Sequence, residues 1–358
     1  MPNKNLSPYL FFLLNEGKVI CWDYKNHQQF ELEKEYFNRL VEISKGIKKS
    51  SPIDKDLEEA NCIGNFDSLS EWGWDELSKI FHIGTQNIPT SHSVENFSQH
   101  INEYLNFCEN TFSNSVLQPI EKPGIKIKLP PPNLALIENQ SFKTVLEKRR
   151  TYRSFNKTPL SIDLISTLLF CVFGNYHPDD PQFKELNLQQ TIIRKTSPSA
   201  GGLHSSEAYL VSLFIEQLNR GIYHYESYSH TLTMVSNDTE INLGNLLEGQ
   251  HFANNLSAGV FITSRFEKVW KKYPHSRGYR HILLDIGHLS QTFQLCSTAL
   301  NLHPWLTGAF LDKEVSQLLK IENTTEQPMF FLGVGLGDGY FLDNETRRIL
   351  AERNSTKI

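Results

Sequence analysis

The first 45 residues alternate short apolar runs with turn residues, a pattern that predicts a small sheet followed by a helix. Residues 9–14 and 18–24 are mostly apolar and flank Asn15-Glu16-Gly17, where glycine permits the left-handed turn that closes a hairpin. Residues 27–32 predict a third strand. Residues 34–45 predict a helix, because their apolar positions recur every three or four residues.

The pattern weakens between residues 45 and 118, where only residues 74–81 and 94–111 predict helices. Prolines then follow in close succession, and because proline fixes φ and lacks an amide donor, this stretch should be extended. They are Pro119, Pro123, Pro130, Pro131 and Pro132. We therefore expect a linker over residues 118–140, a winged-helix-like domain over 1–117 and a second domain over 141–358.

The second domain mixes helical and strand patterns without a regular strand–helix–strand alternation, which predicts an α+β fold rather than a doubly wound sheet. Predicted helices cover residues 141–150, 162–173, 281–302 and 313–320. Predicted strands cover residues 207–215, 221–225, 231–235, 259–263 and 329–334. Ser161 and Gly174 bound the second of these helices, and Asp312 is the expected cap of the last. The charged C-terminal segment predicts a tail or arm.

Composition narrows the function classes. The chain has 358 residues, 39% hydrophobic and 11% aromatic, which is enough for a sizeable core, and its net charge of −5 argues against nucleic-acid binding. The cysteines, Cys21, Cys62, Cys108, Cys171 and Cys296, are scattered without a C-x-x-C motif. This favours neither a disulfide framework nor a zinc site and is typical of a reducing cytoplasm. Because neither a signal peptide nor an apolar stretch of ~20 residues is evident, we predict a cytoplasmic protein.

Two segments carry the candidate chemistry. Arg149-Arg150-Thr151-Tyr152-Arg153 combines three guanidinium groups with a hydroxyl, a set that suits the oxygens of a phosphate. Pro198-Ser199-Ala200-Gly201-Gly202-Leu203-His204 is rich in small residues, so its backbone can approach a flat ring closely. Together the two segments indicate a planar, phosphorylated cofactor.

Four stretches together resemble the SagB-type dehydrogenases, the thiazole/oxazole-forming branch of the FMN-dependent nitroreductase superfamily. They are Arg149–Phe155, Pro198–Tyr209, Lys272–Gln291 and Gly308–Leu319. Each stretch is weak evidence alone, but their order and spacing are like those of the family. The resemblance implies a nitroreductase-like flavin domain in which helices flank a central, mostly antiparallel sheet.

The resemblance also implies that FMN is the cofactor and that three segments bind it. The residues implied for its phosphate and ribityl chain are Arg149, Arg150, Thr151 and Arg153. Those implied for the flavin ring of the partner subunit are Pro198, Ser199, Ala200 and Gly202, and those near its reactive nitrogen N5 are Gly308 and Ala309. Gln291 resembles a position near the flavin, although Thr292 replaces the usual asparagine. The structural alternatives are a solvated charge cluster, a turn before a strand and an ordinary loop.

Lys272 and Tyr273 are the candidate catalytic residues, because the azoline-oxidising members that this chain resembles carry a Lys-Tyr pair here. Aromatising a thiazoline or oxazoline removes a hydride and a proton, so a base must lie beside the ring carbon. A desolvated lysine can act as a neutral amine, and a charged lysine can instead favour the ionised tyrosine. An exposed basic residue beside a packing aromatic is the structural alternative.

The resulting hypothesis is an FMN-dependent dehydrogenase that oxidises thiazoline or oxazoline rings in a ribosomally made peptide, with oxygen reoxidising the flavin. The implied partners are an azoline-containing precursor peptide, a cyclodehydratase and a second copy in a homodimer. The N-terminal domain either adds the leader peptide as an extra strand or supports the dimer. An NAD(P)H-dependent reductase and a non-catalytic scaffold are the rival functions. No metal site is expected, because His281 and His288 lack a third ligand.

Overall fold

The computed structural model describes residues 4–47, 49–66, 72–89, 97–112, 119–177, 181, 185, 194–321 and 325–355. The chain divides into two compact units, one of residues 1–100 with 275–277 and one of residues 101–274 with 278–358. The predicted boundary between residues 117 and 118 lies outside the described residues. The division into a winged-helix-like domain, a linker and a flavin domain therefore stays a prediction.

The smaller unit contains the predicted hairpin and helix. Strands β2 (Leu10–Asn15), β3 (Lys18–Asp23) and β4 (Gln28–Leu32) form an antiparallel sheet in that order. Its other elements are β1 (Asn5–Leu6) paired with β5 (Ile63–Gly64), and helices α1 (Lys34–Ser44), α2 (Asp54–Glu59) and α3 (Glu76–Gly84). Glu16 and Gly17 both have positive φ, 49° and 79°, as a tight two-residue hairpin turn requires. Helix α4 (Phe97–Phe112) follows along the chain.

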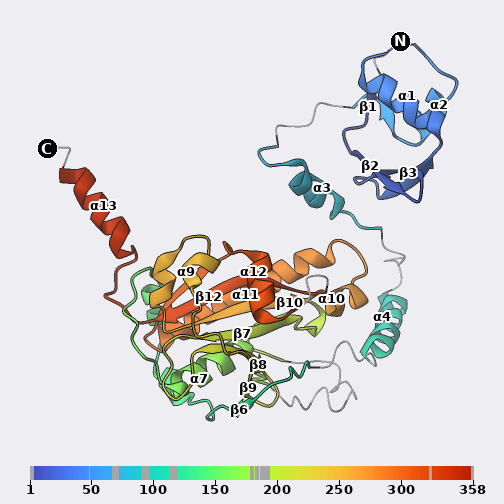
Figure 1. Ribbon diagram of the computed structural model, residues 1–358. Helices are drawn as coiled ribbons and strands as arrows, with labels where there is room; N and C mark the ends of the chain where they lie inside the picture. Colours follow the sequence, from blue (N-terminus) through green and yellow to red (C-terminus); the bar gives the residue numbers. More distant parts are fainter. Residues whose placement is uncertain are drawn as a thin grey trace. The chain divides into compact units, whose positions relative to one another are not determined.

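The larger unit is built on a seven-stranded sheet in which every neighbouring pair of strands is antiparallel (Figure 1). The strand order is β11-β12-β10-β7-β8-β9-β6. The bounds are β6 Lys126–Lys128, β7 Ser206–Ser212, β8 Gly221–Glu226, β9 Thr231–Ser236, β10 Ala258–Arg265, β11 His303–Thr307 and β12 Glu326–Gly335. The α+β fold with a mostly antiparallel sheet is therefore confirmed.

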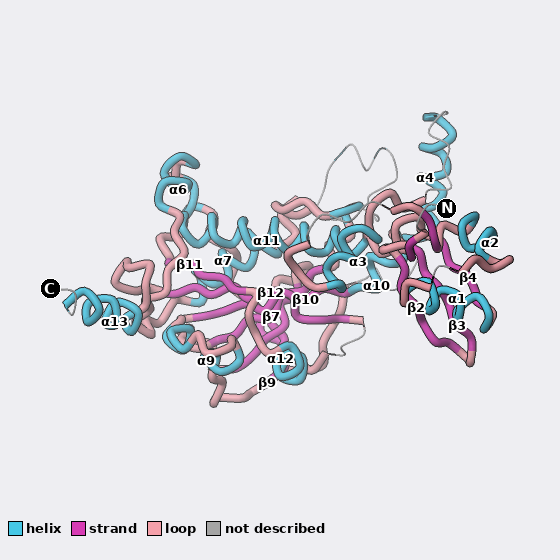
Figure 2. The backbone as a smooth tube through the Cα atoms, turned by 90° about the horizontal axis from the view of Figure 1, so that it is seen from above, coloured by secondary structure: helices cyan, strands magenta, loops and turns pink. Residues whose placement is uncertain are grey.

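Helices cover both faces of this sheet (Figure 2). On one face lie α7 (Ile162–Phe173) and α11 (Gly278–Ala299), and on the other lie α9 (Leu243–Leu246) and α12 (Asp312–Leu319). Besides α4, the described part of the unit also contains α5 Ala135–Glu138, α6 Phe142–Lys148, the 3-10 turns η2 Ala200–Gly202 and η3 His251–Asn255, α10 Phe266–Lys272 and α13 Asn344–Ser355.

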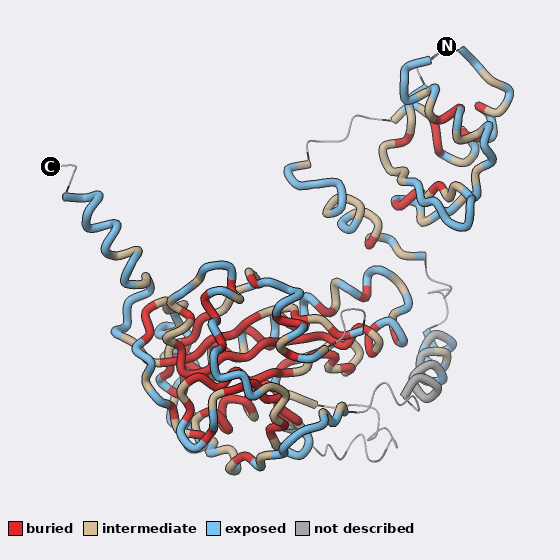
Figure 3. The backbone as a smooth tube through the Cα atoms, viewed as in Figure 1, coloured by how far each residue is buried: buried red, intermediate tan, exposed pale blue. Residues whose placement is uncertain are grey.

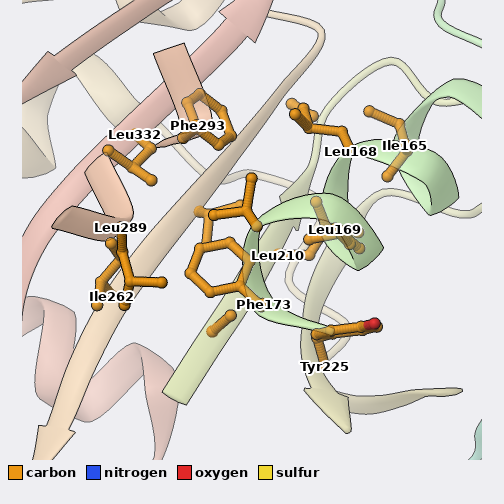
Figure 4. Packing of buried hydrophobic residues seen from close by; sticks show 14 of the residues in the cluster. Ile165, Leu168, Leu169, Phe173, Leu210, Tyr225, Ile262, Leu289, Phe293 and Leu332 are labelled. Carbon is orange, nitrogen blue, oxygen red and sulfur yellow. The ribbon is translucent and has the colours of Figure 1, made fainter. Parts of the chain in front are cut away.

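Side chains of the central strands alternate between two apolar cores. Along β7, Leu210 packs with α7 and α11, whereas Tyr209 and Val211 face the core under α9 and α12. Phe261 of β10 belongs to the second core, and its neighbours along the strand belong to the first. Because both faces are covered, β10 is buried throughout and β7 is buried except at Glu207 (Figure 3), and Figure 4 shows the first core from close by.

Several element ends follow from local chemistry. The hydroxyl of Ser161 accepts a hydrogen bond from Leu164 N at the start of α7, so the predicted cap is confirmed. The predicted capping role of Asp312 is wrong, because Leu311 is the residue before the first turn of α12 and Asp312 lies inside it. The charged C-terminal segment, predicted as a tail or arm, forms helix α13, which has no buried residue among those described.

Strands β6 and β11 were not expected, and both lie at the edges of the sheet. Residues Lys126–Lys128 of β6 lie in the proline-rich segment, and β11 contains Pro304. Proline is tolerated at a sheet edge because no second neighbour needs its missing amide. None of the helices in the described part of the chain has the length and apolar character to cross a membrane.

Candidate functional site

The small-residue loop and the Lys-Tyr pair lie together in one chain. Lys272 is the last residue of α10 and Tyr273 follows it. The Nζ atom of Lys272 donates a hydrogen bond to the carbonyl oxygen of Gly201 at 3.1 Å, and the lysine is only 5% exposed. The structural alternative of an exposed basic residue is therefore wrong for Lys272.

Gly201 is the point of closest approach between the loop and this pair. Its φ is +61°, and a Cβ atom added there would lie 2.7 Å from Lys272 Nζ and 2.8 Å from Tyr273 Oη. The amine and the phenol are therefore neighbours beside one glycine, where no side chain of residue 201 intervenes. The ring of Tyr273 also lies 4.9 Å from the imidazole of His281, measured between centroids.

Asp285 of α11 holds the first residues of the loop. Its Oδ2 accepts a hydrogen bond from the Ser199 hydroxyl at 2.5 Å, and its Oδ1 accepts one from Ala200 N at 3.1 Å. Burial raises the pKa of Asp285 above its ordinary value, although the hydrogen bonds from Ser199 and Ala200 oppose this shift. Pro198, at the start of the loop, is exposed, and Gly202 has a positive φ of 67°.

The arginine segment lies elsewhere, beside the edge strand β11. The amide of Tyr152 donates to Pro304 O at 3.0 Å, and its ring stacks on that of His303. Arg149 donates to the Oε1 atom of Gln294 at 3.0 Å and approaches the Thr151 hydroxyl at 3.4 Å.

The three guanidinium groups of this segment have no carboxylate within ion-pair distance among the described residues. Arg150 donates to main-chain oxygens of Glu147 and Arg149, and Arg153 approaches Phe341 O at 3.4 Å. By contrast, Arg347 and Arg348 of α13 are paired with carboxylates. Uncompensated positive charge at Arg149, Arg150 and Arg153 fits an anionic ligand such as a phosphate.

Gly308 and Ala309 follow directly after β11, the strand that the arginine segment contacts through Tyr152. Gly308 is exposed. The amide of Ala309 donates to the hydroxyl of Thr307 at 3.0 Å, and its carbonyl oxygen lies 3.5 Å from the side-chain amide of Gln250. The backbone amide of Ala309, one of the two predicted to lie near the flavin, thus already donates a hydrogen bond within the chain.

A single chain therefore forms two separate groups of predicted site residues. Asp285, which holds the loop, and Gln294, which binds Arg149, lie nine residues apart on α11, or roughly 14 Å along a helix axis. Figure 2 shows α10 and α6 at opposite ends of α11. Gln291 is an exposed residue of α11, and the buried Gln294, which sequence reasoning missed, makes the contact with the arginine segment.

A buried charged cluster adjoins the loop and was also missed. Glu207 of β7 lies 3.2 Å from His224 Nε2, 3.8 Å from Arg265 Nη1 and 3.9 Å from Lys268 Nζ. Burial favours a higher pKa for Glu207, but the hydrogen bond with His224 and the positive charge of Lys268 outweigh it and lower the pKa to about 2. The sequence signal that could have indicated this cluster is Glu207 itself, a charged residue in the otherwise apolar predicted strand 207–215.

Lys195 belongs to the same surroundings. Burial lowers its pKa to about 8, the charge of Glu207 opposes this shift, and the charge of Lys268 adds to it. Lys195, His204 and Ser206 line a pocket of about 20 Å³, which has room for about one water molecule. Among the described residues, no group of three or more histidine, cysteine, aspartate or glutamate side chains is placed to hold a metal ion.

Comparison with known proteins places this arrangement in a family. A model of the nitroreductase family matches residues 146–336, which is more than half of the chain. A protein of Methanocaldococcus jannaschii named as a nitroreductase, MJ1384, is 29% identical over 202 residues, covering 56% of this chain and 92% of that protein. The microcin B17-processing protein McbC of Escherichia coli is 26% identical over 239 residues, covering 62% of this chain and 81% of that protein.

A solved structure agrees on the fold. The crystal structure of an Anabaena variabilis protein described as a nitroreductase has a TM-score of 0.52 and 24% identity, and it covers 76% of this chain. This chain spans about half of that protein, 49% of its length. The resemblance inferred from the four sequence stretches is thus confirmed at the level of the family and the fold.

The charge cluster predicts a specific acid sensitivity. The pKa of Glu207 is about 2 in the folded chain and 4.5 as its ordinary value, so its ionised form stabilises the fold above pH 4.5. This contribution, about 3 kcal/mol, should be lost as the pH falls from about 4.5 towards 2. Urea unfolding of Glu207→Gln at a series of pH values should show a deficit of about 3 kcal/mol at pH 7 that shrinks across this range.

Glu216→Gln is the matched control, because Glu216 is an exposed carboxylate of the same unit. It should stay within about 0.5 kcal/mol of the unsubstituted protein at every pH. A Glu207→Gln deficit that does not change between pH 7 and pH 2 would contradict the assignment.

Proposed function

We propose that this chain, which belongs to the nitroreductase family, is an FMN-dependent dehydrogenase that oxidises thiazoline or oxazoline rings of a ribosomally made peptide to thiazole or oxazole. The observation that carries the proposal is the close approach of Lys272 and Tyr273 to the glycine of a small-residue loop. The relative McbC, named as a microcin B17-processing protein, supports a peptide as the substrate.

The residues present fit FMN in two respects. The guanidinium groups of Arg149, Arg150 and Arg153, with the Thr151 hydroxyl, offer donors to a phosphate without a competing carboxylate among the described residues. The loop of Ser199, Ala200 and Gly202 offers little side-chain bulk to a flat ring. FMN held by these residues would supply a hydride acceptor for the oxidation of the substrate ring.

Lys272 and Tyr273 are proposed to take the proton that leaves the ring carbon. Both polar atoms occupy the space beside Gly201 where a Cβ atom would stand, so only a glycine lets the loop backbone come this close to the amine and the phenol. The carbonyl oxygen of Gly201 accepts a hydrogen bond from Lys272 Nζ and so orients the amine. A base held in this way needs no reorganisation before it accepts the proton.

We further propose a homodimer, because the two groups of site residues lie at opposite ends of α11 and one flavin would use both. The outward face of this helix carries Tyr279, the adjacent pair Leu283 and Leu284, Gly287 and Gln291, and these positions recur every three to four residues. Leu284 is 60% exposed, and nothing lies within 4 Å of a Cβ atom placed on Gly287. An apolar stripe with a glycine at its centre lets a second α11 approach closely.

The N-terminal domain is proposed to bind the leader peptide. Strand β2 lies at the edge of its sheet and exposes Phe12, Leu13 and Leu14. An exposed apolar edge strand can accept a further strand, whose main-chain hydrogen bonds do not depend on the residues being modified. A cyclodehydratase that supplies the azoline rings is the proposed protein partner.

The rival function is an NAD(P)H-dependent flavin reductase, which the name of the relative MJ1384 favours. The two reactions change the substrate mass in opposite directions, because dehydrogenation removes a hydrogen pair from each heterocycle and reduction adds one. Mass spectrometry of an azoline peptide incubated with the purified protein therefore separates them.

Lys272→Met should lower the rate of azoline dehydrogenation at least about 100-fold, because the base would be lost, while bound flavin keeps its visible absorbance. Tyr273→Phe should lower the rate as well. Lys271→Met is the matched control, because Lys271 is the exposed neighbour on the same helix, and its rate should be unchanged. An unchanged rate in both Lys272→Met and Tyr273→Phe, with flavin bound, would exclude the proposed catalytic pair.

Leu284→Lys should shift the protein from dimer to monomer in sedimentation equilibrium and lower its flavin content, because a charge would replace an apolar contact at the centre of the α11 face. Leu77→Lys is the control, since Leu77 is an exposed leucine of α3. A dimer that persists in Leu284→Lys would place the interface elsewhere.

Deletion of residues 1–117 should weaken binding of a full-length precursor peptide at least about tenfold, as strand addition would be lost. Binding of a peptide without its leader should not change. Fluorescence anisotropy measures both affinities. Equal affinities for the full-length precursor before and after the deletion would rule out leader binding and favour the dimer-supporting role.

A further inference from the structure

We infer that Asp285 and Lys268 are positioning residues that together hold the loop Ser199–His204 so that Gly201 stays against Lys272 and Tyr273. Neither residue is proposed to touch the substrate. The importance of this placement for catalysis rests on the proposed function, but the clamping of the loop does not. The inference follows from the conformation of the loop, its hydrogen bonds and the burial of the two side chains.

The loop has a backbone conformation that needs external support. Gly201 and Gly202 have φ values of 61° and 67°, and His204 has a φ of 44° although it carries a side chain. A non-glycine residue in the left-handed region is strained, and such strain persists only where surrounding contacts hold it. The residues that bind the loop are therefore expected to decide its conformation.

Asp285 connects the two ends of the loop through Ser199. Both of its carboxylate oxygens are used, one by the Ser199 hydroxyl and one by Ala200 N. The Ser199 hydroxyl oxygen in turn accepts a hydrogen bond from His204 N at 3.0 Å. A single carboxylate, 6% exposed, thus orders residues at the start and at the end of the loop.

Lys268 supports the loop from α10. It lies one helical turn before Lys272, so the two side chains share a face of the helix. Lys272 Nζ donates to Gly201 O, and Lys268 Nζ approaches the carbonyl oxygen of the strained His204 at 3.4 Å. Two buried lysines of one helix therefore contact two carbonyl oxygens of one loop.

The burial of Lys268 is tolerated because a carboxylate lies beside it. Lys268 is 4% exposed, and Glu207 Oε1 lies 3.9 Å from its Nζ atom. Glu207 belongs to β7, which begins two residues after the loop ends. A buried cation is retained only where it is paired and hydrogen-bonded: Glu207 supplies the opposite charge, and the carbonyl oxygen of His204 supplies a hydrogen-bond acceptor.

Hydrogen–deuterium exchange of the full-length protein tests the clamp without requiring any activity. In Asp285→Asn and in Lys268→Met, amides of residues 199–204 should exchange at least about tenfold faster, the effect of losing a hydrogen bond to a charged group. Exchange in α7 and β10 should stay unchanged. Lys268→Arg should restore part of the protection, because it keeps a buried donor. Ser199→Ala, a milder change, serves if Asp285→Asn does not fold.

Kinetics then connect the clamp to the reaction. In these variants kcat should fall about tenfold or more while KM for the peptide changes less than twofold. The reason is that the Lys-Tyr pair would no longer be correctly positioned against the loop, whereas the contacts that bind the peptide would remain. Lys271→Met is the control for both measurements. Unchanged exchange of residues 199–204 in folded Asp285→Asn and Lys268→Met would overturn the inference. Absence of dehydrogenation in the unsubstituted protein, with faster exchange in the variants, would overturn the proposed function and leave the clamp standing.

Discussion

The approach of Gly201 to Lys272 and Tyr273 is the contact on which the candidate site depends, and the pairing of β7 with β10 creates it. The two strands are antiparallel, with Ser206 at the start of β7 opposite Ser264 near the end of β10. The loop leads into β7 and helix α10 follows β10 directly, so both must lie at the same end of the sheet. A shift of β7 by one residue against β10 would move the side chains of β7 to the opposite face of the sheet and displace the loop from the lysines.

Charge is arranged differently in the two groups of site residues. Around the loop, Lys268 lies beside Glu207, Arg265 pairs with Glu267, and the loop itself satisfies both oxygens of Asp285. In the arginine segment the positive charge has no such balance among the described residues, and each guanidinium contacts only neutral oxygen atoms. The charges around the loop thus have partners within the chain, whereas the charges of the arginine segment suit an external anion.

Much of the fold could be predicted from local sequence, because apolar periodicity and capping residues act within a few positions. Helix α7 has the expected bounds, with Ser161 at its start, and the central strands appear where apolar runs were found. Strand β11 was missed because Pro304 and a short length hide an edge strand in sequence. Asp312 was misplaced as a cap because α12 begins at Asp312 itself, one residue before the predicted start of the helix.

The supporting residues of the site could not be predicted, because their partners are remote in sequence. Asp285 binds Ser199 and Gln294 binds Arg149, and the residue type of neither identifies a partner so far away in sequence. The sequence does show that polar residues occur at buried positions of this helix. A buried carboxylate or amide must find hydrogen-bond donors or acceptors, because leaving it without them is energetically costly. In this chain the Ser199 hydroxyl and the Ala200 amide supply them for Asp285, and Arg149 supplies one for Gln294. Two buried polar residues of α11 therefore hold the loop and the arginine segment in place.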